Sequence, residues 1–102
     1  MSELSAEETQ FWDAVDAFID TANREADNTD PGIISSAILY AAARFSAFYV
    51  ASFAESRKDF IEDSEETIRH YSEEFLKLMQ ENIADYGENF KVYMREDEEP
   101  QA

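Results

Sequence analysis

The chain has 102 residues, enough for one domain with a hydrophobic core and too few for two. Its 24 Asp and Glu residues outnumber 8 Lys and Arg residues, and the formal net charge of −16 argues against direct binding to nucleic acid or anionic lipid, because phosphate groups are bound by basic surfaces. The chain has no cysteine, which excludes disulfides, thiolate nucleophiles and cysteine-ligated metal sites.

The first predicted helix is amphipathic. It starts at Ser5, which has the spacing of a capping box with Glu8, and it fades by Asp27. The residues before it have neither the basic nor the apolar region of an export signal, so we expect a cytoplasmic protein. Its apolar positions recur at spacings of three and four residues: Phe11, Val15, Phe18, Ile19, Ala22 and Ala26.

The second predicted helix begins with Asp30 as N-cap and Pro31 in its first turn, and it runs to about Ala54. Its only charge is Arg44, near the middle. The segment is long enough to span a bilayer, but Arg44 at that depth costs about 2.5–3.5 kcal/mol on the insertion scale. We therefore expect no membrane span. Four serines further reduce the hydrophobic gain: Ser35, Ser36, Ser46 and Ser52.

The third predicted helix opens at Asp63 or Ser64, because Asp63 and Glu66 again have capping-box spacing. Residues 57–62 before it are expected to form a short extra helical turn. Gly87 interrupts the helix and marks an expected bend. The apolar stripe continues over about seven turns with a period of 3.6 residues: Ile68, Tyr71, Phe75, Leu78, Met79, Tyr86, Phe90 and Tyr93.

These elements predict an all-α three-helix bundle with long second and third helices, as a single domain over residues 1–94 followed by a disordered acidic tail at 95–102. The second helix is apolar around its circumference, since Leu39 and Val50 project nearly opposite its main apolar side. Two neighbouring helices cover only part of that circumference, so we expect a homodimer. The main side consists of Ile34, Ile38, Phe45, Phe48, Tyr49 and Phe53.

Two segments, ILYAAARFSAFYVA (38–51) and ENIADYGENFKVYM (81–94), carry a family resemblance. The chain resembles a small family of uncharacterised bacterial, acidic, all-helical proteins known only as a domain of unknown function. The likeness spans about Phe11 to Met94. It implies an all-helical bacterial protein and transfers no catalytic residue.

Arg44 and Asn82 are the candidate ligand-binding or structural polar cluster. Arg44 can be an anion clamp, or a structural arginine whose head reaches an acid such as Glu25 or Asp85; the structural role is favoured. Asn82 interrupts the third helix's apolar stripe, where a polar residue more often fixes register or oligomeric state than binds a ligand.

A ribbon of carboxylates follows the polar side of the first helix, and it can imitate a phosphate backbone or form a solvated surface; the second is favoured. His70, the only histidine, lies on the polar side of the third helix, and the sequence has no metal-ligand or catalytic motif, so we expect no metal, cofactor or catalytic residue. The ribbon comprises Asp13, Asp16, Asp20 and Asp27.

The sequence therefore favours a non-catalytic protein-interaction or regulatory module with an unidentified protein partner. Two alternatives stay open. One is an acidic decoy for a basic nucleic-acid-binding protein, which uses the carboxylate ribbon. The other is a small-molecule site or enzyme around Arg44 and Asn82.

Overall fold

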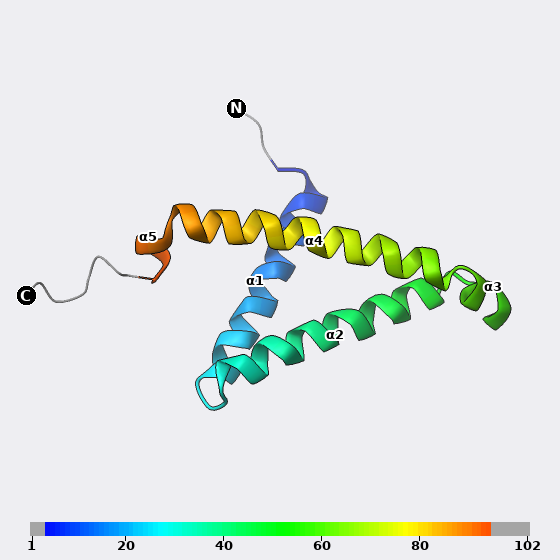
Figure 1. The fold of residues 1–102 in the computed structure, drawn as a ribbon, viewed down its shortest axis with the longest axis horizontal. Helices are drawn as coiled ribbons and strands as arrows, with labels where there is room; N and C mark the ends of the chain where they lie inside the picture. The colour runs from blue at the N-terminus through cyan, green and yellow to red at the C-terminus, as the bar shows by residue number, and fades with distance from the viewer. Residues whose placement is uncertain (1–3, 95–102) are drawn as a thin grey trace, which may run out of the picture. The chain divides into compact units, whose positions relative to one another are not determined.

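The computed structural model describes residues 4–94. All regular structure within this range is helical, which confirms the all-α class (Figure 1). The chain divides into two compact units, Met1–Phe53 and Ala54–Ala102. The single domain expected over residues 1–94 stays a prediction, and the tail expected at 95–102 lies outside the described residues.

The first unit is a helical hairpin of α1 (Ala6–Ala26) and α2 (Pro31–Ala51). The predicted capping box of α1 is confirmed. The Ser5 hydroxyl accepts a hydrogen bond from the Glu8 backbone N–H at 3.1 Å, and the Glu8 carboxylate accepts one from the Ser5 backbone N–H at 2.9 Å. Both bonds satisfy N–H groups that a helix leaves without internal partners at its start.

The start of α2 is also confirmed. Asp30 Oδ2 accepts a hydrogen bond from the Gly32 backbone N–H at 3.0 Å, and Pro31 is the first helical residue. The end of α2 falls at Ala51, three residues before the predicted Ala54. There the Ser52 hydroxyl donates a hydrogen bond to the Tyr49 carbonyl at 2.6 Å, which satisfies one of the carbonyls left free at a helix end.

The two helices of the first unit meet at their short turn and diverge from it (Figure 1). Thr29 and Ile34 are half-buried close to this turn, and Ala22 and Ala26 are half-buried at the end of α1. Contact between the helices is therefore strongest near the turn. Neither helix of this unit has a fully buried residue.

The second unit contains α3 (Arg57–Glu62), α4 (Ser64–Glu88) and α5 (Phe90–Met94). The short helix expected at 57–62 is thus present as α3. The capping box predicted for Asp63 and Glu66 is wrong, because the Asp63 side chain makes no capping bond. Asp63 already closes α3, with its N–H donating to the Asp59 carbonyl at 3.1 Å, and its helical backbone (φ −90°, ψ −4°) differs from the extended one that an N-cap adopts.

The predicted bend near Gly87 appears two residues later. α4 ends at Glu88, and Asn89 leaves helical geometry with φ −111° and ψ 30° before α5 begins. The long third helix of the prediction is therefore two helices in the structure. The three-helix bundle itself is not confirmed, since the described residues form five helices.

Candidate functional site

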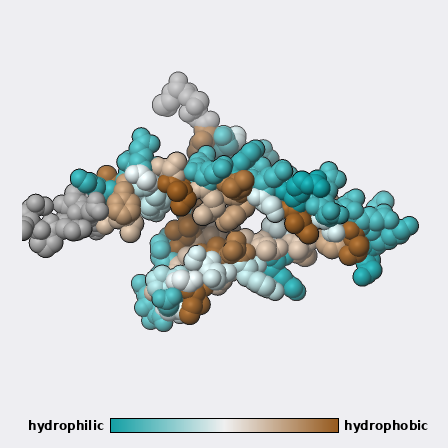
Figure 2. Space-filling model, viewed as in Figure 1, coloured by the Kyte–Doolittle hydropathy of each residue, from teal (hydrophilic) through white to brown (hydrophobic). Residues whose placement is uncertain are grey.

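Exposed apolar surface is the main feature of the described residues. None of the side chains in residues 4–94 is fully buried, and apolar side chains lie open among hydrophilic ones in the space-filling view (Figure 2). Single exposed hydrophobic residues are ordinary in soluble proteins, but large contiguous apolar patches mark interaction sites. Both α2 and α4 expose several large apolar side chains, and α2 differs from α4 in carrying no Asp or Glu.

Four aromatic side chains gather along the C-terminal half of α2 and just beyond its end, and we name them the aromatic face of α2: Phe45, Phe48, Tyr49 and Phe53. Helical spacing places them on one side. They stack in two pairs: the ring centroids of Phe45 and Phe48 lie 5.8 Å apart, and those of Tyr49 and Phe53 lie 4.9 Å apart at 82°. Both separations are in the range of favourable aromatic pairs.

The aromatic face is not covered by the other helix of its own unit. Its members are between 52% and 69% exposed. Since a whole aromatic side chain buries about 150–250 Å², the four together leave about 500 Å² available for burial. Their rings contact one another without being covered, so the face is preassembled and unoccupied within its unit.

Charge separates α2 from the other long helices. α2 contains no Asp or Glu, whereas α1 and α4 each contain several. Arg44 is the only ionisable cation on α2 and lies at the edge of the aromatic face, next to Phe45 in sequence. Among residues 4–53 of its own unit, its guanidinium forms no ion pair or hydrogen bond, Glu25 included.

Asn82 belongs to the other unit, on α4, so its proximity to Arg44 stays a prediction. Its side-chain amide donates a hydrogen bond to the Leu78 carbonyl at 2.8 Å, one turn earlier on the same helix. One amide proton and the amide oxygen remain for another partner. Within its own unit Asn82 therefore has a local structural bond and no ligand-binding geometry.

The four carboxylates of the predicted ribbon are exposed. Asp13, Asp16 and Asp20 lie on α1, and Asp27 is its C-cap residue. Their spacing places them on the side of the helix opposite Val15 and Ala22. A solvated acidic surface accounts for this arrangement.

A cluster that the sequence reasoning missed joins α4 to α5. Tyr93 donates a hydrogen bond from its hydroxyl to Asp85 Oδ2 at 2.9 Å, and the Asn89 amide donates to Asp85 Oδ1 at 3.0 Å. Tyr86 and Tyr93 stack at 4.5 Å. The hydrogen bond to the Asp85 carboxylate, together with its negative charge, raises the pKa of Tyr93. The spacing of Asp85, Asn89 and Tyr93 by four residues each was the available sequence signal.

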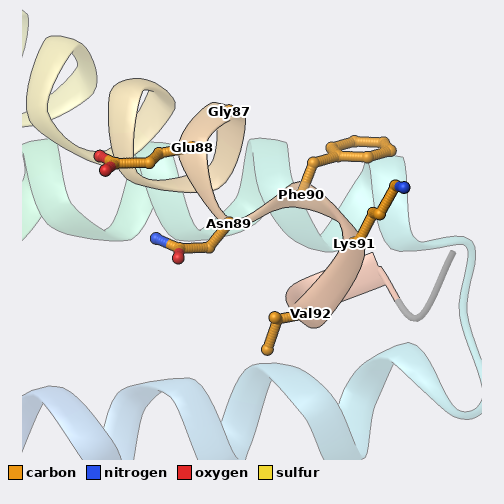
Figure 3. A pocket seen from close by; sticks show the side chains of 6 residues that line it. All are labelled: Gly87, Glu88, Asn89, Phe90, Lys91 and Val92. Atoms are coloured by element: carbon orange, nitrogen blue, oxygen red, sulfur yellow. The ribbon is translucent and has the colours of Figure 1, made fainter. Parts of the chain in front are cut away.

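A shallow hollow lies at this junction and is formed by residues 87–92 (Figure 3). The labelled side chains of Phe90 and Lys91 extend to one side, Val92 to another, and Glu88 away from both. They do not converge on a common point, as the polar groups of a ligand site do. The hollow therefore offers no geometry for catalysis or specific binding.

By length and composition, α2 is the one described helix able to cross a membrane, and core helices of soluble proteins pass the same test. Arg44 near its middle and the serines on several sides weigh against a span. The absence of a membrane span stays a prediction.

Comparison with known proteins identifies a family. No curated protein and no solved structure matches the chain. A family model described as "Protein of unknown function (DUF3144)" matches residues 11–86, which include all of α2 and most of α1 and α4. The match ends eight residues before the Met94 limit of the expected resemblance. The chain therefore belongs to the DUF3144 family of proteins of unknown function.

Proposed function

We propose that this protein is a non-catalytic helical interaction module that binds another polypeptide through the aromatic face of α2. The observation that supports this most directly is the exposure of that face: four aromatic side chains, stacked in pairs, are each more than half exposed. Interfaces are enriched in aromatic residues at their centres and depleted in carboxylates there. The aromatic face has both properties.

Completion of a helical bundle is the proposed mode of binding. α2 is apolar around its circumference, and α1 contacts it mainly near the turn. An amphipathic helix of the partner placed along the aromatic face covers the rings and gives a bundle of at least three helices. Such helix-in-groove recognition relies on apolar anchors at spacings of three and four residues, as in Phe45, Phe48, Tyr49 and Phe53.

The acidic decoy has less support, because it rests on the carboxylate ribbon alone. The small-molecule alternative also lacks support: no polar side chain of the described residues is buried, and the hollow at residues 87–92 has no converging polar groups. Protein recognition through apolar contact is therefore the function that the geometry favours.

Photo-crosslinking tests this proposal. A benzophenone amino acid replaces Phe45 on the aromatic face in one variant and Tyr40 in the other. Tyr40 is the matched control, because it lies on the same helix and is 70% exposed, against 67% for Phe45. In cells that produce the full chain, we expect a protein adduct of defined mass from position 45 and none from position 40. Lipid adducts only, or equal adducts from both positions, would contradict the proposal.

A further inference from the structure

We infer that the polypeptide bound by the aromatic face of α2 is a second copy of this chain, related to the first by a two-fold axis that passes close to α2. This inference rests on the proposed function and names the partner for the same surface. Three observations support it: the charge of α2, the area of its aromatic face and the number of long helices that one chain provides.

Charge restricts where two copies can meet. The chain has a formal net charge of −16, so most contacts between copies would bring carboxylates together. α2 is the only long helix in the described range without an Asp or Glu. A two-fold contact between the two α2 helices therefore avoids bringing carboxylates together at its centre.

The exposed area fits a dimer. A standard interface buries about 800 Å² of each partner, and the aromatic face alone provides about 500 Å². Two exposed residues on the same side extend the surface: Ala41, one turn before Phe45, and Ile38, two turns before it. A two-fold axis uses each of these residues twice, so the same patch serves both partners.

The number of helices points in the same direction. Besides α2, the described residues contain two helices longer than six residues, α1 and α4. A helix that is apolar on every side needs more neighbours than these to be enclosed. A second copy provides further helices without requiring any other gene product, and two-fold homodimers are the commonest oligomers.

Single cysteines test the inference, because the natural chain has none. Ala41→Cys lies one turn before Phe45 on the aromatic side, and Ala47→Cys lies on the opposite side. Both replace an exposed alanine on the same helix with a small residue, so the helix should be retained in each. The purified full chain is treated with a short bismaleimide in detergent-free buffer, and covalent dimer is measured by gel and mass spectrometry.

We expect covalent dimer from Ala41→Cys and none from Ala47→Cys. Equal crosslinking of the two variants would overturn the proposed interface. If neither variant crosslinks, maleimide labelling at low protein concentration separates the remaining cases. A monomer with a reactive cysteine at position 41 would refute the second copy and leave the aromatic face free for another protein. A monomer whose cysteine at position 41 does not react with maleimide would refute the second copy and the proposed function together. The same conclusion would follow if that cysteine were protected from maleimide only in the presence of phosphatidylcholine vesicles.

Discussion

Phe45→Ala tests the energetic weight of the aromatic face. The substitution removes a phenyl ring without changing charge, and alanine preserves the helix because its helix propensity is the highest. Phe45 is 67% exposed, so at ~200 Å² per aromatic side chain about 130 Å² is available for burial. At 25 cal/mol per Å² this area corresponds to about 3 kcal/mol per chain, or about 6 kcal/mol for the two copies in a dimer.

The measured loss should be smaller than this sum, since association also costs side-chain and rigid-body entropy. We expect at least about 2 kcal/mol, a rise of about 30-fold in the dimer Kd, as for a residue at the centre of an interface. The control Tyr40→Ala removes a ring of similar exposure from another side of α2. Its effect should stay within about 0.5 kcal/mol, roughly twofold.

Sedimentation equilibrium over a range of chain concentrations measures both dissociation constants, and far-UV circular dichroism checks that helix content is unchanged. A large rise for Phe45→Ala with little change for Tyr40→Ala would support the interface. Equal rises for the two variants, or none for Phe45→Ala, would exclude the proposed interface, because the energy of association would then not reside in the aromatic face.

Three further predictions concern salt, the glycines and the junction of α4 with α5. Raising NaCl from about 0.1 to about 1 M shortens the Debye length from about 10 to about 3 Å, so the dimer Kd of these like-charged chains should fall. A rise in the dimer Kd with salt would contradict an apolar interface between copies, because weakening by salt is expected of a decoy on a basic partner. Gly87→Ala should raise the free energy of unfolding by about 0.5 kcal/mol in denaturant titrations, because an added Cβ meets no atom within 4 Å. Gly32→Ala should raise the free energy of unfolding by less, because its Cβ would lie 2.9 Å from Asp30 Oδ2, the atom that caps α2. Equal increases for the two variants would show that the Asp30 side chain moves away at no cost. Asp85→Asn should lower the raised pKa of Tyr93 toward 10 in ultraviolet titrations. The stabilisation of the folded chain by the Tyr93–Asp85 hydrogen bond is present below the unfolded pKa near 10 and is lost as pH rises through the higher folded pKa. An unchanged pKa of Tyr93 in this variant would show that Asp85 does not cause the shift.

Local structure could be predicted where it depends on neighbours in sequence. The capping box of Ser5 and Glu8 and the Asp30–Pro31 start of α2 follow from hydrogen bonds that span two or three residues. The same reasoning failed at Asp63, because spacing alone does not reveal that one residue closes α3 and opens α4. Helix ends also moved by a few residues, since several competing hydrogen bonds satisfy the last carbonyls of a helix.

Tertiary structure and the candidate site were less accessible from the sequence. The apolar pattern correctly marked Phe45 and Phe48 as one side of a helix, but a hydrophobic side chain has no sequence signal for whether its own chain or a partner covers it. Arg44 and Asn82 lie in different units, so no local spacing in the sequence tests whether they form one cluster. Asp85, Asn89 and Tyr93 had a local signal, but their hydrogen bonds required the break at Asn89 that separates α4 from α5.

Dimer formation through α2 is tested most directly by the mass of the unmodified full chain in solution, measured by light scattering after size exclusion in detergent-free buffer at micromolar concentration. We expect the mass of two chains, with the dimer persisting at high salt. A folded chain with the mass of one molecule at every concentration would contradict the claim that a second copy covers the aromatic face of α2.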